Sequence, residues 1–137
     1  MLNEAKELLR IFPELYGKFD RPDIEPDTIR SYDSDNLMGT YLAVFDLFDE
    51  LVETGNESRA KELLSFTKQK LYADRPNWPS DLSTAITIGF LENFGHREKL
   101  WKQLNKWFSK SEYEEFKEEF HYLHEEEGRN YLESLYS

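Results

Sequence analysis

The sequence contains no cysteine among its 137 residues. This absence excludes disulfide bonds, thiolate metal sites and cysteine nucleophiles together. The sequence also lacks a G-x-S-x-G nucleophile elbow, a P-loop and a Rossmann glycine fingerprint, the motifs of many acyl-transfer, phosphate-binding and dinucleotide-binding enzymes. No pair of carboxylates is marked out by an apolar setting for acid–base catalysis. We therefore expect a protein without catalytic residues and without enzymatic activity.

Long hydrophobic runs are absent as well. The first ten residues, MLNEAKELLR, include acidic residues and lack the apolar stretch of a signal peptide or an anchor. The uncharged stretch between residues 82 and 91 is too short to span a bilayer. A soluble, cytoplasmic protein is the expectation.

Positive charge is scarce: 17 Lys and Arg stand against 28 Asp and Glu, which gives a net charge of -11. Phosphate contacts need a surface of Lys and Arg, so neither nucleic acid nor an anionic membrane is expected as the main partner. A basic protein partner is compatible with this charge. Solubility alone is the simpler explanation.

Hydrophobic residues make up 39% and aromatic residues 15% of the chain, enough for a folded core. The length fits one domain, which we place at 1–137. Apolar residues recur at helical spacing and no alternating strand pattern appears. The sequence predicts an all-α fold, an irregular bundle of about five to six helices in antiparallel hairpins. The lengths of the hairpins at 36–72 and 81–127 also allow a HEAT-like pairing.

The helix boundaries follow from capping and turn residues. A first helix over 3–16 has Asn3 as its candidate N-cap, and Pro13 should end or bend it; a loop follows at 17–35. The second helix, capped by Asp35 or Asn36, ends at a turn in which Gly55 is left-handed. The remaining helices are expected over 57–72, over 81–94 with Ser80 or Asp81 as the N-cap, over 96–108, and from 109 or 111 to the C-terminal end with an interruption at Gly128.

The stretch 81–94, DLSTAITIGFLENF, is apolar on nearly every side of a helix. We therefore predict a helix buried on several sides, against which amphipathic helices pack. Gly89 in its middle costs about 1 kcal/mol relative to Ala, which indicates close approach of a neighbouring helix or ring.

One constellation resembles a metal site. In it, Glu118, His121 and His124 follow one another at intervals of three on one predicted helix, and Glu125 comes next. Helical di-iron sites use two Glu-x-x-His elements and two further carboxylates, whereas this chain has one such element. The two histidines more readily fit the border of the helix's apolar face. We expect neither a bound metal nor a cofactor.

Charge is segregated along the chain. Acidic stretches at 20–35, 46–57 and 112–127 flank a basic segment at 97–110. Asp46, Asp49, Glu50 and Glu53 recur at intervals of three and four, so they form one stripe on a helix. The ordinary explanation pairs the basic segment with the acidic segment that follows it. The stretch 31–58 contains no Lys or Arg, so its stripe would then remain without a partner.

The segments LMGTYLAVFDLFDELVETGN (37–56) and AITIGFLENF (85–94) resemble an uncharacterised bacterial family of short, all-helical domains. In that family a hairpin broken at Gly-Asn or Gly-Asp is followed by an apolar helix ending in Phe-Leu-Glu. The resemblance covers about residues 37–116. It implies an immunity protein of a bacterial polymorphic toxin system, which binds one cognate toxin, and it assigns no functional residue.

These observations lead to one main hypothesis and two alternatives. The main hypothesis is a non-enzymatic immunity protein, or antitoxin, that neutralises a basic toxin or nuclease domain; its oligomeric state stays open. One alternative is a helical adaptor or homo-oligomerising scaffold. The other is a metalloenzyme around Glu118, His121, His124 and Glu125. The residues expected to contact the basic partner are Asp33, Asp35, Asp46, Asp49, Glu50 and Glu53.

Overall fold

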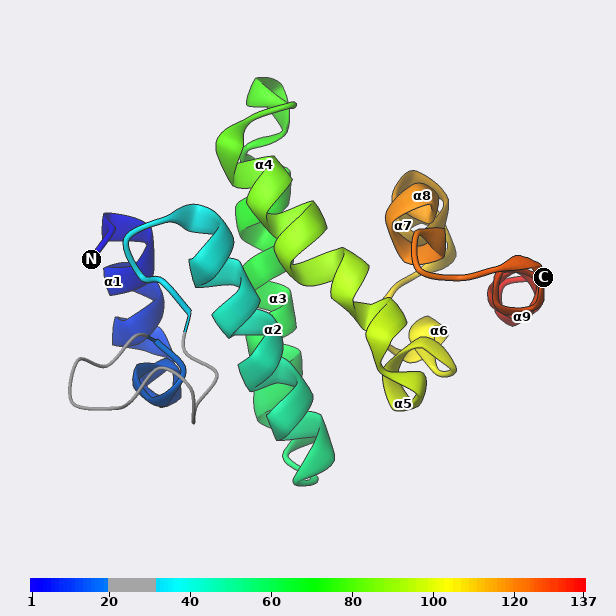
Figure 1. Cartoon of the computed structure of the whole chain (residues 1–137), viewed down its shortest axis with the longest axis horizontal. Helices are drawn as coiled ribbons and strands as arrows, with labels where there is room; N and C mark the ends of the chain where they lie inside the picture. The colour runs from blue at the N-terminus through cyan, green and yellow to red at the C-terminus, as the bar shows by residue number, and fades with distance from the viewer. Residues whose placement is uncertain (20–31) are drawn as a thin grey trace.

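A computed structural model of the chain describes residues 1–19 and 32–137, and these residues form helices joined by short turns (Figure 1). Among these residues, the only β-type backbone pairing is an isolated bridge between Phe19 and Tyr32. The predicted all-α class is confirmed. The loop predicted over 17–35 falls largely on residues 20–31, which lie outside the described part.

The first helix, α1 (Asn3–Ile11), is shorter than predicted. Pro13 begins a 3-10 turn, η1 (Pro13–Gly17), because proline cannot donate the hydrogen bond that would continue an α-helix. The prediction that Pro13 ends or bends the helix is confirmed. The capping prediction is wrong: Leu2 holds the N-cap position and Asn3 is the first helical residue.

Helix α2 (Leu37–Glu53) is the centre of the fold and contacts α1, η1, α3, α4 and η3. The side chain of Asn36 accepts a hydrogen bond from the Gly39 backbone N–H at 2.6 Å, so the predicted N-cap is confirmed. The buried residues of α2 are Gly39, Thr40, Tyr41, Ala43, Val44, Leu47, Phe48, Leu51 and Val52.

Helix α3 (Glu57–Ala73) runs back alongside α2, as Figure 1 shows. Gly55 has a φ of 81°, the left-handed conformation that ends many helices. Asn56 then caps α3 by accepting from the Arg59 N–H. The predicted antiparallel hairpin is confirmed.

After the 3-10 turn η2 (Arg75–Asn77), three helical segments form one continuous path that passes across α3 and packs against α2 (Figure 1). They are α4 (Asp81–Ile86), the π-helical η3 (Thr87–Leu91) and the 3-10 turn η4 (Glu92–His96). Ser80 forms the predicted cap of α4.

The close approach at Gly89 is confirmed: a Cβ placed there would lie 3.2 Å from Met38 Sδ and 3.4 Å from Tyr41 Cβ. The predicted burial on several sides is confirmed, because α2, α3 and α8 (Lys117–His121) all contact this path. Ile88 lies on a side that stays open to solvent and is 44% exposed.

The C-terminal part is more broken than predicted. The predicted helix over 96–108 is divided into α5 (Glu98–Trp101) and α6 (Leu104–Trp107), and the last predicted helix is divided into α7 (Lys110–Glu115), α8 (Lys117–His121) and α9 (Glu126–Leu135). The final break falls at 122–125 and not at Gly128, which lies in the first turn of α9. The described residues therefore form nine α-helices rather than five to six.

The buried side chains of all these elements form one hydrophobic cluster. Phe94 lies near its middle, with its ring centroid 5.1–5.6 Å from those of Phe45, Phe48, Phe90 and Phe108. None of the described helices combines the length and the apolar character that crossing a membrane requires.

Candidate functional site

The acidic stripe predicted on α2 exists as one face of that helix. Asp46 and Asp49 are each 20% exposed at the side chain, and Glu50 and Glu53 are each 55% exposed. The first two carboxylates thus line the base of the stripe, and the last two reach into solvent. We refer to Asp46, Asp49, Glu50 and Glu53 as the α2 stripe.

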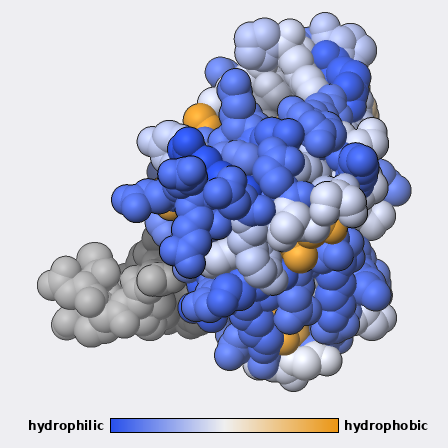
Figure 2. All heavy atoms as spheres, turned by 90° about the vertical axis from the view of Figure 1, so that its right-hand side faces the viewer, coloured by the Kyte–Doolittle hydropathy of each residue, from blue (hydrophilic) through white to orange (hydrophobic). Residues whose placement is uncertain are grey.

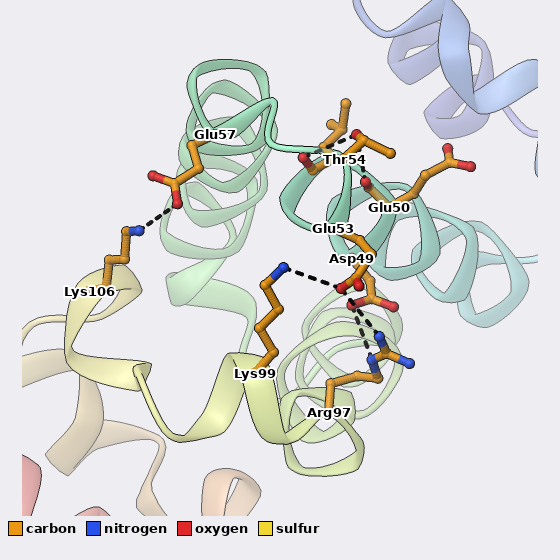
Figure 3. A network of polar contacts seen from close by, with 9 residues as sticks. Asp49, Glu50, Glu53, Thr54, Glu57, Arg97, Lys99 and Lys106 are labelled. Atoms are coloured by element: carbon orange, nitrogen blue, oxygen red, sulfur yellow. Dashed lines mark hydrogen bonds and ion pairs between the residues drawn. The ribbon is translucent and has the colours of Figure 1, made fainter.

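Cations from two distant segments meet this stripe. Lys18 Nζ lies 3.2 Å from Asp46 and 3.3 Å from Glu50. Arg97 lies 3.2 Å from Asp49, and both Arg97 and Lys99 approach Glu53, at 3.6 and 3.4 Å (Figure 3). The prediction that the stripe remains without a partner is therefore wrong, because tertiary folding supplies three cations to its four carboxylates.

The basic segment 97–110 also pairs differently from the sequence expectation. Lys106 reaches Glu57 at the start of α3 at 2.5 Å, next to the Arg97 and Lys99 contacts with α2 (Figure 3). Among the described ion pairs, none joins this basic segment to the acidic stretch 112–127. Carboxylates of that stretch bind other cations: Glu112 binds Lys68, and Glu115 binds Arg75.

Beside the α2 stripe lies a hollow of about 440 Å³. Its polar wall is formed by the carboxylates of Asp46 and Asp49 and the guanidinium of Arg97. Phe45 and Leu42 supply apolar surface. The lining residues are Tyr32, Leu42, Phe45, Asp46, Asp49, Asn93, His96 and Arg97.

The electrostatics of this hollow remain acidic despite the ion pairs. Burial raises the pKa of Asp49, and the carboxylates of Glu53 and Asp46 add to that rise, while Arg97 opposes it without cancelling it. Burial would lower the pKa of Lys18, but Asp46 and Glu50 outweigh burial and raise it. The four carboxylates of the α2 stripe exceed its three cations by one negative charge, which favours a further cation.

A stability prediction follows from Asp49. A raised pKa means that ionised Asp49 is less favourable in the folded than in the unfolded chain. The contribution of Asp49 to the free energy of unfolding is therefore most favourable below its unfolded-state pKa, near 4, and is lost as the pH rises. We expect the melting temperature of Asp49→Asn, relative to that of the unmodified protein, to increase from pH 4 to pH 7. Thermal unfolding followed by circular dichroism would measure this difference.

Glu14 supplies a control with the opposite sign. Hydrogen bonds from Arg59, at 2.8 and 2.9 Å, lower the pKa of Glu14. Its stabilisation is present above the unfolded pKa and is lost as the pH falls through the lower, folded pKa. Glu14→Gln should therefore be more harmful at pH 7 than at pH 4. Parallel pH trends in the two variants would contradict the assignment for Asp49.

Asp33 and Asp35 do not join the α2 stripe. They precede α2 at its N-terminal end, where Asp33 accepts hydrogen bonds from the Asp35 backbone N–H at 2.7 Å and the Asn36 side chain at 2.9 Å. Asp35 pairs with the N-terminal amine at 2.5 Å. These two carboxylates thus order the turn that begins α2 and are separated from the stripe along the helix.

A second group of carboxylates was not singled out as a contact surface by the sequence. These carboxylates lie on η4, on α8, in the turn between α8 and α9, and at the start of α9. Among the described residues, none of them forms an ion pair. The side of the molecule that carries α7, α8 and α9 is predominantly hydrophilic (Figure 2). The members are Glu92, Glu118, Glu119, Glu125, Glu126 and Glu127. The excess of Glu in 112–127 could have indicated this group in the sequence. We instead expected these carboxylates to pair with the basic segment.

The histidine constellation is not assembled as predicted. Helix α8 ends at His121, so His124 lies in the following turn and not on the same helix face. His121 Nε2 instead lies 2.6 Å from Tyr113 Oη. Within residues 1–19 and 32–137, no group of three His, Asp or Glu side chains could hold a metal ion.

The comparisons with known proteins bear on family membership alone. No curated protein and no solved structure matches the chain. One family description does match: Domain of unknown function (DUF7674), over residues 5–125. Because this region spans most of the chain, from within α1 to the end of α8 and beyond, the chain belongs to the DUF7674 family.

Proposed function

We propose that this protein is a non-enzymatic binding protein for a basic protein partner, and that the α2 stripe and its hollow form the contact surface. The observation that carries the proposal is the acidic hollow: Asp46 and Asp49 line it, and three cations leave the four carboxylates of the stripe incompletely neutralised. The net charge of -11 acts in the same direction, since it would steer a basic partner toward the molecule.

The size and lining of the hollow suit a lysine or arginine side chain. Its volume of about 440 Å³ exceeds that of one such side chain. Phe45 and Leu42 can cover the aliphatic stem, while Asp46 and Asp49 accept hydrogen bonds from the charged end.

The internal ion pairs favour binding rather than prevent it. Lys18 and Arg97 hold the carboxylates of Asp46 and Asp49 in fixed positions. A carboxylate that is already ordered loses less side-chain entropy when it binds. Glu50 and Glu53, at 55% exposure, remain accessible to charges at the rim of an interface.

In its most specific form, the proposal is a bacterial, cytoplasmic immunity protein that blocks a basic toxin or nuclease domain. The acidic charge and the resemblance of 37–56 and 85–94 to small helical domains of that kind support it. It predicts a complex of one to one whose association slows as salt rises. It also predicts that co-expression of this chain protects cells from the toxin domain.

The first test is capture of partners from the native lysate at low and moderate salt, followed by binding measurements on the partner identified. We expect one basic protein. The double variant Glu50→Lys, Glu53→Lys should then lose about 2 kcal/mol or more, close to a 30-fold weaker affinity. Circular dichroism would verify that the variant is folded.

The matched control reverses the same number of carboxylates on another face. Glu126→Lys, Glu127→Lys changes the net charge equally, in the first turn of α9. We expect a much smaller loss of affinity from this pair. Equal losses of affinity in both variants would show that net charge alone, and not the α2 stripe, determines binding. A loss confined to the α9 variant would contradict the assignment of the contact surface to α2.

A further inference from the structure

Helix α9 is held against the rest of the molecule by a small set of contacts, and the region that matches the family ends at residue 125, just before it. Leu132 is the fully buried residue of α9. Tyr131 donates to the Lys102 carbonyl and Tyr136 to the Phe108 carbonyl, each at 2.9 Å, and the Tyr136 ring stacks on Tyr113 at 4.2 Å. In Figure 1 α9 lies at the edge of the molecule, beyond α6 to α8.

His124 lies in the turn that leads into α9, and its half-buried ring lines a hollow at the surface. Its ring meets Trp101 edge to face at 4.6 Å. A Cβ placed on Gly128 would lie 2.6 Å from His124 Nδ1, and one placed on Gly95 would lie 3.4 Å from Nε2. The imidazole therefore occupies space that a Cβ on Gly128 would take, whereas a Cβ on Gly95 would only touch it.

The Nε2 atom of His124 is shielded from solvent and has no hydrogen-bond partner among the described residues. A neutral imidazole can place an unprotonated nitrogen there, whereas a protonated ring carries an N–H on both nitrogens. Protonation in place would therefore bury a charged donor without an acceptor, which is costly unless the ring moves out to water.

Charged groups surround the site without providing that acceptor. Helix α5 presents Glu98, which pairs with Lys102 at 2.5 Å in the following turn. Glu125, which precedes α9, and Glu127 of α9 line the same hollow as Glu98 and His124. On the other side, Arg129 opposes protonation of His124, and His121 of α8 lies near Glu133, Arg129 and Lys117.

We propose that α9 is a pH-released latch: protonation of His124 in mildly acidic solution detaches α9 from α5 to α8 and uncovers the aromatic side chains of Trp101 and Tyr113 beneath it. The ring of His124 leaves its place between Gly95 and Gly128, and the turn at 122–125 acts as the hinge. The α2–α3 hairpin and the core around Phe94 stay folded.

The sign of the effect follows from burial. Burial, together with Arg129, lowers the pKa of His124. A lowered folded-state pKa gives docking that is stable above the ordinary histidine pKa of about 6.5 and is weakened as the pH falls below it.

Hydrogen exchange on the full chain at pH 7.5 and 5.5, corrected for intrinsic rates, tests the latch. We expect the protection of amides in 126–135 to fall by about tenfold more than that of amides in α2 and α3. His124→Gln should abolish this difference, whereas His96→Gln, at an exposed histidine, should retain it. Unchanged protection of α9 at pH 5.5, or an undiminished pH response in His124→Gln, would overturn the proposal.

Two further measurements test the latch without the His124→Gln variant, which could itself disturb packing. NMR titration of the unmodified protein should show that His124 titrates at the pH at which α9 loses protection; titration of His124 while α9 stays protected would overturn the latch. Gly128→Ala should loosen α9 at both pH values, because its Cβ displaces the imidazole. Full protection of α9 in that variant at pH 7.5 would show that the His124 position does not control docking.

Discussion

Replacing Phe94 with alanine is expected to lower the free energy of unfolding by about 3–5 kcal/mol. The Phe94 side chain is fully buried. Its ring contacts Phe45 and Phe48 of α2, Phe90 of η3 and Phe108 after α6, so the cavity would open where these three segments meet η4. Chemical denaturation followed by circular dichroism would measure the change.

The control for this prediction is Tyr122→Ala. Tyr122 is 67% exposed, and exposed substitutions of this kind usually change stability by less than about 0.5 kcal/mol. A loss below about 1 kcal/mol in Phe94→Ala would show that the surrounding segments can collapse into the space. The interpretation of Phe94 as the joint between α2 and the C-terminal helices would then be wrong.

Replacing Gly39 with alanine should have the second-largest effect. Its new Cβ would lie 2.3 Å from the carbonyl oxygen of Asp33 and 2.8 Å from the Asp33 nitrogen. Backbone atoms cannot move aside as a flexible side chain can, so the turn before α2 must shift. Overpacking costs about 3 kcal/mol and the better helix propensity of alanine returns about 1 kcal/mol, which leaves a net loss of about 2 kcal/mol.

Gly17→Ala is the matched control. A Cβ on Gly17 would meet nothing within 4 Å, and alanine reduces the conformational freedom of the unfolded chain. We expect a stabilisation of about 0.5 kcal/mol, or no change. Denaturation curves of the two variants side by side would test this contrast, and equal effects would show that the Asp33–Gly39 contact does not limit the fold.

Local signals in the sequence predicted much of the local structure. The N-caps at Asn36 and Ser80, the left-handed Gly55 and the end of α1 at Pro13 each depend on a residue's own backbone preference or on bonds within four residues. Such short-range chemistry is written in the chain. The helix spacing of α2 likewise predicted that its acidic residues share one face.

The breaks in the C-terminal half were not predictable in the same way. The apolar spacing over 96–108 and 109–135 continues through Lys102, Phe116 and Tyr122, where the structure interrupts the helices. Phe116 leaves helical geometry, with φ -111° and ψ 25°, and is buried against Tyr72 and Trp78. Packing of the C-terminal helices against α3 and η4 thus overrides their local preference.

The helical class, the α2–α3 hairpin and the position of the acidic stripe follow from local sequence, because periodicity and caps act within one or two helical turns. Which charges meet depends on the tertiary fold. Lys18 lies 28 residues before Asp46, and Arg97 lies 48 residues after Asp49, yet folding places each cation on its carboxylate. Charge along the chain carries no information on such pairing, since an ion pair depends on distance in space and on the burial of both groups.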